Sequence, residues 1–392
     1  MNIEYLHVEN FRVFQDTTIK NVPALAVFMG QNGTGKTTFF DIFGFLHECL
    51  TNNVRSAINA RGGYDAVISR EQKGSIKFVI KFRPSMQEPL ITYELSICLR
   101  DKVPVVEKEI VRFRRGQSGA PWKILNFAFG EGDAAQGNLQ TYQDVNTAER
   151  KRQKLFSPDV LAIKGLGQFE EFPAIMSLRR LIEDWYVSDF HVDDTRGSRG
   201  EYGESLSKTG HNLAQVAKFL YEAHPNRFAA ILLSMQQRIP GISNVEAKLT
   251  DEGNVALRFQ DGRFKDPFAA KFVSDGTIKM FMYLVLLNEP NLHALLCVEE
   301  PENQLYPNLL RQLAEEFRNY SAIGGQVFVS THSPDFLNSI KLGELFCLVK
   351  RDGYTRIVRM EESNLVQSLV RQGDMLGELW NQGILLEEAT QL

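Results

Sequence analysis

The hydrophobic and polar positions of this chain follow two different periods. In three runs, 75–82, 91–98 and 105–113, apolar residues occupy every second position. A period of two is typical of strands with one buried face, so these runs predict an antiparallel sheet. Residues 3–8 alternate in the same way and predict another half-buried strand near the N-terminus.

The last third of the chain instead contains short, continuous apolar runs between amphipathic segments. Strands of this kind are buried on both faces, as in a parallel sheet with helices on each side. The expected strands are 294–298, 326–331 and 345–349, and the expected helices are 276–288 and 307–319.

The middle of the chain is less regular. Residues 129–147 are rich in Gly, Asp and Gln and have no period, which predicts an exposed loop. Residues 244–260 are expected to form two strands. Helical patterns are predicted for the segments 148–156, 168–186, 211–223 and 225–237.

The length of 392 residues exceeds one ordinary domain, so we expect more than one lobe. We divide the chain into an N-terminal lobe (1–128), an inserted and mostly helical lid (129–242) and a C-terminal lobe (243–392). The fold class is α/β, with a parallel core and an accessory antiparallel sheet.

Composition and charge narrow the class of protein. Hydrophobic residues make up 43% of the chain and charged residues 23%, as in ordinary globular proteins. The net charge of −4 excludes a general basic field, so any nucleic-acid contact must be local. Four scattered cysteines without a C-x-x-C pair argue against a disulfide framework or a zinc site. We see no secretory signal and no apolar run of ~18 residues, and expect a cytoplasmic protein without membrane contact.

One stretch fits the pattern G-x-x-x-x-G-K-[S/T] at every fixed position: Gly30-Gln31-Asn32-Gly33-Thr34-Gly35-Lys36-Thr37. An apolar run, 24–29, precedes it and a helical pattern, 37–50, follows, which is the context that phosphate binding requires. Glycines let N–H groups surround a polyphosphate, Lys36 can reach its β- and γ-phosphates, and Thr37 can ligate Mg²⁺. A chance glycine turn is the alternative. The residues expected to hold a nucleoside triphosphate are Gly30, Asn32, Gly33, Thr34, Gly35, Lys36, Thr37 and Thr38.

Two acidic residues, Glu299 and Glu300, follow the predicted strand 294–298. Ligands bind at the C-terminal edge of the strands in open α/β sheets, so this pair should lie beside the glycine loop. One carboxylate can hold Mg²⁺ and the next can deprotonate an attacking water. We assign Glu299 to the metal and Glu300 to the base. Without the glycine loop, such a pair would more often be a solvated turn.

Two further segments have a chemistry that depends on this context. Ser274, Asp275, Gly276 and Thr277 begin a predicted apolar helix and could grip a γ-phosphate at its N-terminus. The alternative is an ordinary N-cap. His332 directly follows a predicted strand and could contact the γ-phosphate and the attacking water, although a lone histidine is usually structural.

These four segments, in this order, resemble those of ABC-type ATPases. The matching segments are Walker A at 30–37, the signature at 274–277, Walker B at 295–300 and the switch histidine at 332. Within that superfamily the chain looks closest to the RecF/OLD-like group. That likeness rests on Asn10-Phe11-Arg12, Ser274–Thr277, Glu299–Glu302 and Thr331–Pro334, and it hardly covers 85–240. Glu299 stands where the wider superfamily has Asp, and Tyr306-Pro307 where the group commonly has His-Pro.

The resemblance implies the fold of an ABC-ATPase head, with a P-loop core, an accessory antiparallel β-sheet and an inserted helical lid. It also implies an ATPase that uses ATP and Mg²⁺ and forms a head-to-tail homodimer. ATP would lie between Walker A of one subunit and Ser274–Thr277 of the other, with Glu300 and His332 as catalytic residues.

The sequence does not indicate an effector for such an ATPase. OLD-type relatives carry a C-terminal Toprim nuclease domain, whereas the 60 residues after His332 are too few for one and lack a spaced D-x-D set. The leading hypothesis is therefore a sensor or regulatory ATPase of a bacterial anti-phage defence system, working with a separately encoded nuclease or toxin.

An alternative is a RecF-like DNA-repair or DNA-binding ATPase that uses local basic stretches. These stretches are 112–115, 149–154, Arg179-Arg180, and Arg196 with Arg199. Such runs are more often solvated faces. A binding module without activity is disfavoured by Glu300 and His332, and a transporter's nucleotide subunit by the antiparallel region 75–128.

Overall fold

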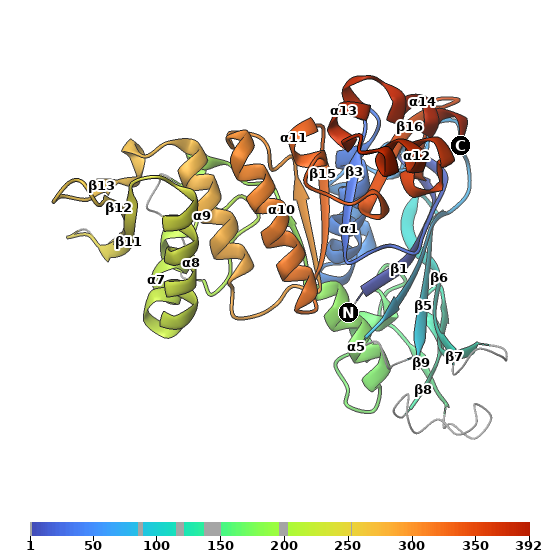
Figure 1. Ribbon diagram of the computed structural model, residues 1–392. Helices are drawn as coiled ribbons and strands as arrows, with labels where there is room; N and C mark the ends of the chain where they lie inside the picture. Colours follow the sequence, from blue (N-terminus) through green and yellow to red (C-terminus); the bar gives the residue numbers. More distant parts are fainter. Residues whose placement is uncertain (1, 85–88, 115–120, 137–149, 196–202, 252) are drawn as a thin grey trace.

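The computed structural model describes the chain in six stretches: 2–84, 89–114, 121–136, 150–195, 203–251 and 253–392. Two large sheets lie at one end of the molecule, and an arm rich in helices extends from them (Figure 1). A third, small sheet lies at the tip of the arm.

The central sheet has six strands in the order β10-β14-β15-β3-β16-β17. Their bounds are Trp185–Ser188 (β10), Leu295–Glu299 (β14), Gln326–Thr331 (β15), Leu25–Met29 (β3), Leu345–Arg351 (β16) and Tyr354–Arg359 (β17). All neighbours are parallel except β17, which pairs antiparallel with β16. The predicted parallel sheet is confirmed, and it includes the strand that precedes the glycine loop.

Both faces of this sheet are covered, which explains why its inner strands β3 and β14 are almost entirely apolar. On one face, Phe28 of β3 packs against Phe39 of helix α1 (Lys36–Thr51), with ring centroids 4.4 Å apart. On the other face, Val27 and Met29 belong to the apolar cluster that contains the buried side of α10 (Pro307–Ala322). The glycine loop therefore starts from a strand that is fixed on both sides.

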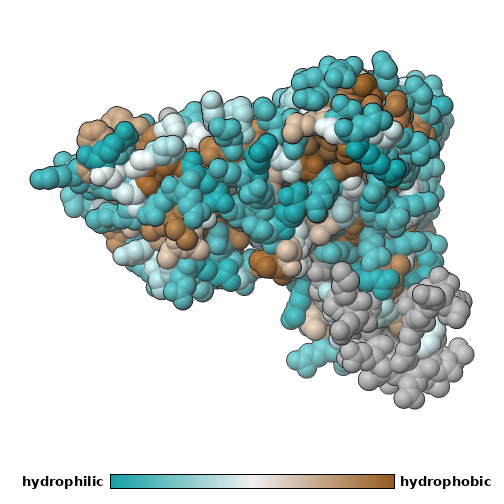
Figure 2. Space-filling view, in the orientation of Figure 1, coloured by the Kyte–Doolittle hydropathy of each residue, from teal (hydrophilic) through white to brown (hydrophobic). Residues whose placement is uncertain are grey.

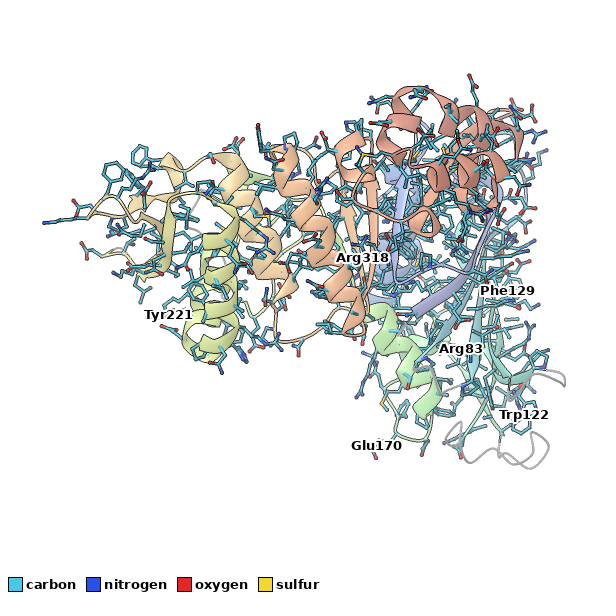
Figure 3. The ribbon with its side chains drawn as sticks, viewed as in Figure 1. Arg83, Trp122, Phe129, Glu170, Tyr221 and Arg318 are labelled. Atoms are coloured by element: carbon cyan, nitrogen blue, oxygen red, sulfur yellow. The ribbon has the colours of Figure 1, made fainter. Side chains whose placement is uncertain are left out.

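The second sheet is antiparallel and has eight strands in the order β2-β1-β4-β5-β6-β7-β8-β9. They are Asn2–Phe11 (β1), Phe14–Lys20 (β2), Ile76–Arg83 (β4), Leu90–Arg100 (β5), Val103–Arg114 (β6), Trp122–Ala128 (β7), Glu131–Ala135 (β8) and Arg150–Lys154 (β9). Buried residues alternate with more exposed ones along β4 and β5, so the prediction from the period of two is confirmed. Ion pairs join neighbouring strands. One joins Arg83 of β4, which is labelled in Figure 3, to Glu4 of β1 at 2.6 Å.

The helix predicted at 148–156 is wrong, because residues there form β9. Its basic residues face acidic partners on β8: Lys154 lies 2.6 Å from Glu131, and Arg150 pairs with Asp133. Cross-strand charge pairs stabilise a sheet, and they depend on a neighbouring strand that the local pattern does not show. β8 itself lies within the loop predicted at 129–147, whose residues 137–149 fall outside the described stretches.

The arm contains the helices predicted at 211–223, 225–237 and 276–288. They are α7 (Leu213–Ala223), α8 (Pro225–Arg238) and α9 (Asp275–Leu287), and the tip sheet is β11 (Ile242–Leu249), β12 (Val255–Asp261) and β13 (Phe268–Ala269). Figure 2 shows hydrophobic side chains among polar ones at this tip, where Phe264, Phe268 and Phe272 are exposed. The range 129–242 thus holds strands as well as helices, and its limits stay a proposal.

Short helices complete the two lobes and bring distant parts of the chain together. They are α2 (Val54–Asn59), α3 (Tyr64–Val67), α4 (Ala162–Leu166), α5 (Pro173–Glu183), α6 (Val192–Thr195), α11 (Pro334–Leu337), α12 (Asn364–Gln372), α13 (Leu376–Asn381) and α14 (Ile384–Gln391). The buried side chain of Gln326 accepts from the N–H of Ile3 at 2.8 Å. It also donates to the carbonyl oxygens of Ile3 and Pro23, at 3.0 and 3.1 Å. These hydrogen bonds therefore join β1 of the antiparallel sheet to β15 of the central sheet.

Candidate nucleotide-binding site

The glycine loop joins β3 to α1 in a shape that its glycines allow. Gly33 and Gly35 lie in the left-handed region, with φ of 78° and 101°, which residues with a Cβ rarely adopt. Gly30 approaches β16 so closely that a Cβ there would lie 2.8 Å from the carbonyl oxygen of Leu348. Asn32 is exposed at the tip of the loop.

The N-terminus of α1 presents free N–H groups to this loop. No side chain caps the helix, so the N–H groups of Lys36, Thr37 and Thr38 lack partners within the helix. The buried ammonium of Lys36 donates to the carbonyl oxygen of Gly30 at 2.8 Å. These donors, at the positive end of a helix dipole, fit the phosphates of a nucleotide.

Thr37 and Glu299, both predicted to hold the metal, lie side by side. Burial raises the pKa of Glu299, a hydrogen bond from the Thr37 hydroxyl lowers it, and the nearby carboxylate of Asp189 raises it again. A divalent cation would offset this gathering of negative charge, so the residues fit Mg²⁺. No three potential ligands are preassembled within the described stretches, as is usual where phosphates and water complete the coordination of Mg²⁺.

Glu300 and His332 also come together. Nδ1 of His332 lies 3.4 Å from a carboxylate oxygen of Glu300, because Glu299 is paired with Ser330 in the register of β14 and β15. Glu300 has a φ of 41°, and its N–H donates to the carbonyl oxygen of Ser330 at 2.9 Å. A left-handed residue with a Cβ stores strain, which is a common property of functional sites.

Glu302, the last residue of the segment Glu299–Glu302, is a further candidate, to which the sequence motif assigns no role. Its side chain is only 9% exposed, and one carboxylate oxygen lies 3.3 Å from Nδ1 of His332. The same oxygen accepts from the Thr331 hydroxyl and from the N–H of His332, both at 2.8 Å. The other oxygen is buried and has no partner among the described residues. Glu302 therefore ties the loop after β14 to the end of β15.

Asp189 is a second residue that the pattern does not single out. It follows β10, where Ser188 is paired with Val298 of β14, so it stands beside Glu299 at the sheet edge. Its N–H donates to the carbonyl oxygen of Lys208 at 2.9 Å. The helix predicted for 168–186 is wrong at its end, because α5 stops at Glu183 and β10 begins at Trp185. The position of Asp189 depends on the pairing of β10 with β14, which the local sequence does not show.

Ser274–Thr277 are not brought to the glycine loop of the same chain. They lie at the start of α9 in the arm, whereas α1 lies against the central sheet (Figure 1). Ser274 is the N-cap, and its hydroxyl accepts from the N–H of Thr277 at 3.4 Å. Asp275 begins the first turn. Gly276 packs on the loop after β14, where a Cβ would lie 2.7 Å from the carbonyl oxygen of Gln304.

The basic stretches considered for DNA are only partly engaged in ion pairs. Arg112 pairs with Glu94, and Arg179 lies 2.8 Å from Glu183. Arg150 and Lys154 pair with β8, as described above. Residues 115, 196 and 199 fall outside the described stretches. These pairs reduce the positive charge that is free to meet a phosphate backbone.

A family model described as "AAA domain, putative AbiEii toxin, Type IV TA system" matches residues 25–338, which are 314 of the 392 residues. The chain belongs to this AAA-domain family. The matched region of this family member includes the glycine loop, the start of α9, Glu299, Glu300 and His332. No curated protein matches the chain significantly.

Solved structures resemble this AAA-domain chain over most of its length. A crystal structure titled as the SmcHead bound to the C-winged helix domain of ScpA has a TM-score of 0.55 and 14% identity, covering 91% of this chain and 98% of that chain. The SMC head domain from Thermotoga maritima has a TM-score of 0.45 and 14% identity, covering 92% of this chain and 99% of that chain. A Pyrococcus furiosus Smc head with an extended coiled coil, bound to the C-terminal domain of ScpA, has a TM-score of 0.48 and 13% identity. It covers 94% of this chain and 99% of that chain.

At identities this low, the likeness shows only the fold. The first structure, whose TM-score exceeds 0.5, shows that the chain has the head fold of SMC and ABC-type P-loop ATPases, and the predicted fold class is confirmed. The RecF/OLD-like subgroup stays a prediction. None of the helices in the described part of the chain has the length and hydropathy needed to cross a membrane.

Proposed function

We propose that this AAA-domain chain binds ATP with Mg²⁺ and hydrolyses it to ADP and phosphate. The observation that carries the proposal is the meeting of three neighbouring strand ends. β3 leads into the glycine loop, β14 into Glu299 and Glu300, and β15 into His332. Membership of an AAA-domain family supports it.

In this proposal the loop binds the phosphates and the two acidic residues divide the chemistry. Lys36 neutralises charge on the β- and γ-phosphates, and Thr37 with Glu299 would hold the metal. Mg²⁺, when bound, neutralises the charge that develops on the phosphate oxygens. Glu300 accepts a proton from the attacking water, and His332 positions that water. The remaining loop residues, whose backbone and side chains would line the nucleotide, are Gly30, Asn32, Gly33, Thr34, Gly35 and Thr38.

A head-to-tail homodimer would complete the site. Ser274, Asp275, Gly276 and Thr277 lie apart from the glycine loop of their own chain, so a second copy would have to supply them to the γ-phosphate. The N-terminus of α9 then meets the nucleotide of its partner, and ATP holds the dimer closed until hydrolysis reopens it.

The biological role that we propose is that of a sensor or regulatory subunit in anti-phage defence, with a separate nuclease or toxin effector. The family description, which names a toxin of a type IV system, supports this role. A RecF-like DNA-binding ATPase is the alternative. It is favoured by Lys151 and Arg152 of β9, which are exposed and make no ion pair among the described residues.

The first experiment compares ATP binding and steady-state hydrolysis in the wild type, Glu300→Gln and the control Glu315→Gln, an exposed acid on α10. We expect Glu300→Gln to bind ATP normally and to lose roughly 10²–10⁴-fold in kcat, because the general base is gone. Light scattering should then find a dimer in Mg-ATP. Full hydrolysis by Glu300→Gln would refute the assigned base, and absence of ATP binding would refute the function.

The second experiment purifies the native complex, with and without ATP, and identifies its components. A co-purifying nuclease or toxin would support the defence role. A homodimer alone that binds DNA with a steep dependence on salt would favour the RecF-like role.

A further inference from the structure

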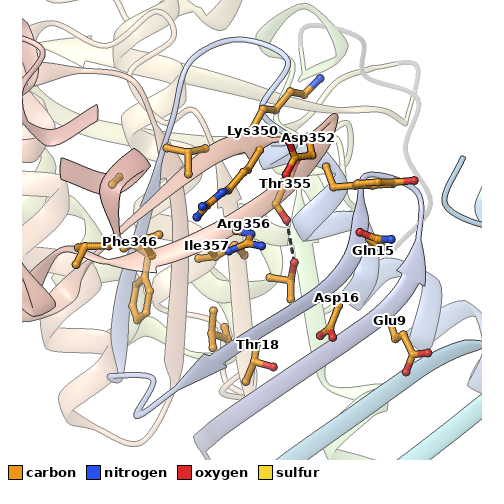
Figure 4. Close-up of a pocket in the computed structure, with 18 of the residues that line it drawn as sticks. Glu9, Gln15, Asp16, Thr18, Phe346, Lys350, Asp352, Thr355, Arg356 and Ile357 are labelled. Carbon is orange, nitrogen blue, oxygen red and sulfur yellow. Dashed lines mark hydrogen bonds between the residues drawn. The ribbon is translucent and has the colours of Figure 1, made fainter. Parts of the chain in front are cut away.

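A groove of about 1200 Å³ lies between β2 and β17, the outer strands of the two large sheets (Figure 4). The two strands meet at Thr355, whose N–H donates to the carbonyl oxygen of Val13 at 2.8 Å. The carbonyl oxygen of Thr355 accepts from the Thr17 hydroxyl at 2.9 Å, the contact drawn in Figure 4. None of the proposed ATP-binding or catalytic residues lines this groove.

The edge of β17 that faces the groove is open beyond Thr355. In an antiparallel pair of strands, the N–H and carbonyl groups of one residue both point toward the paired strand, and those of the next residue both point away from it. The N–H and carbonyl groups of Thr355 point away from β16, toward Val13 and Thr17. The same groups of Ile357 and Arg359, two and four residues further along, therefore also point away from β16. Among the described residues, the outward N–H and carbonyl groups of Ile357 and the outward N–H of Arg359 make no hydrogen bond, whereas the carbonyl oxygen of Arg359 accepts the first bond of the short 3-10 helix Met360–Glu362. An open edge of this kind can accept another strand.

The groove is also rich in unpaired positive charge. Five cationic side chains line it and make no ion pair within the described part of the chain: Lys20, Lys73, Lys350, Arg351 and Arg356. The lining also contains four carboxylates. Glu9 is bound to Lys77 at 2.9 Å and Asp16 lies 3.6 Å from His7, whereas Asp352 and Glu362 make no ion pair within the described residues, so the five unpaired cations outnumber two unpaired carboxylates. In a protein with a net charge of −4, this concentration of free cations favours an acidic occupant.

We propose that this groove binds an extended, acidic segment of a partner polypeptide, which adds as a strand to the edge of β17. Backbone hydrogen bonds to Ile357 and to the N–H of Arg359 would supply affinity, and acidic side chains would pair with the lysines and arginines. A nucleic acid could use the cations and accept from the outward N–H groups, but its phosphates could not donate to the outward carbonyl oxygen of Ile357, as the N–H of an added strand can. The inference rests on the proposed function only in suggesting that the effector supplies the segment.

The test is fluorescence anisotropy of the full chain with a labelled peptide of about ten residues that alternates threonine and glutamate. Three other probes are used beside it: the same peptide with N-methylated alternate residues, a threonine–lysine peptide and an oligothymidine. The variant is Lys350→Glu with Arg356→Glu. The matched control is Lys102→Glu with Arg180→Glu, two exposed cations that do not line the groove.

We expect saturable binding of the acidic peptide that weakens about tenfold or more in the groove variant and is unchanged in the control. N-methylation should weaken binding in the wild type, because it removes the donors that strand addition needs. Binding of oligothymidine but not of the peptide would overturn the proposal in favour of a nucleic-acid site. Absence of saturable binding by either probe would overturn the site itself. ATP binding is measured in the same samples, so failure of the groove and failure of the proposed ATPase are separate results.

Discussion

Glu302 and Glu109 are both buried carboxylates, yet their surroundings give them different roles. Glu302 holds the end of β15 beside the candidate base, so its effect should be seen in turnover. Glu109 on β6 is fully buried and accepts from the Tyr93 hydroxyl at 3.1 Å and the N–H of Ile163 at 3.2 Å. It lies on the antiparallel sheet and not on the central sheet that carries the candidate site, so its effect should be seen in folding.

Replacing Glu302 with glutamine keeps the size of the side chain and an acceptor for Thr331 and His332, but removes its charge. We expect kcat for ATP to fall roughly 10–100-fold with little change in KM or in the melting temperature, as when an outer partner of a catalytic group is lost. The same Glu315→Gln control serves here. An equal loss of ATP affinity or a lowered melting temperature would instead mean that Glu302 acts by stabilising the fold.

The stability of the protein should fall as pH rises through the range of Glu109. Burial raises the pKa of Glu109 from 4.5 to about 7. The native state therefore binds this proton more tightly than the unfolded chain, so its stabilising effect is complete below about 4.5 and is lost as pH rises through about 7. The change in unfolding free energy should be on the order of 3 kcal/mol.

Urea denaturation between pH 5 and 8 measures this effect. Glu109→Gln should remove most of the slope, whereas Glu107→Gln, at a half-exposed position on the same strand, should keep it. Equal slopes in the wild type and Glu109→Gln would show that another group is responsible.

Elements that bury an apolar face could be predicted from the sequence. Elements whose formation depends on ion pairs, and residues whose position depends on strand register, could be predicted less well. The strands at 75–113 and the helices of the arm follow from periodicity alone. β9 does not, because its five residues are all polar and depend on ion pairs with β8. Thr37, Glu299, Glu300 and His332 could be predicted from motifs, whereas Asp189 and Glu302 reach the same edge only through strand pairing.

Two helical glycines should respond in opposite ways to alanine. At Gly276 of α9, a Cβ would lie 2.7 Å from a backbone oxygen of Gln304, so we expect Gly276→Ala to destabilise by about 1–3 kcal/mol. At Gly44 of α1, the nearest atom outside the helix backbone would be 3.9 Å away, and Gly44→Ala should stabilise by about 0.5–1 kcal/mol. Thermal unfolding of both variants measures the difference. A gain of stability in Gly276→Ala would show that the loop after β14 yields easily.

At the scale of the molecule, the two ends of the chain form one structure. Gln326 joins β15 to Ile3 and Pro23, and Thr17 and Val13 bind Thr355. The proposed lobes 1–128 and 243–392 therefore complete each other's core and are not expected to fold separately. The arm, by contrast, leaves the sheets and carries the residues that a second copy would need.

The contact between Thr355 and the glycine loop has a consequence for protease digestion. The Thr355 hydroxyl donates to the carbonyl oxygen of Thr34 at 2.6 Å. The β16–β17 hairpin therefore contacts the loop that would hold ATP. Two exposed tryptic sites, Lys350 and Arg351, lie at the end of β16 next to its turn. Local opening of the hairpin would disturb a bound nucleotide, so Mg-ATP should slow cleavage there but not at Lys102 in the β5–β6 turn. Thr355→Val should abolish the protection, and the hairpin would then serve as a built-in reporter of nucleotide occupancy.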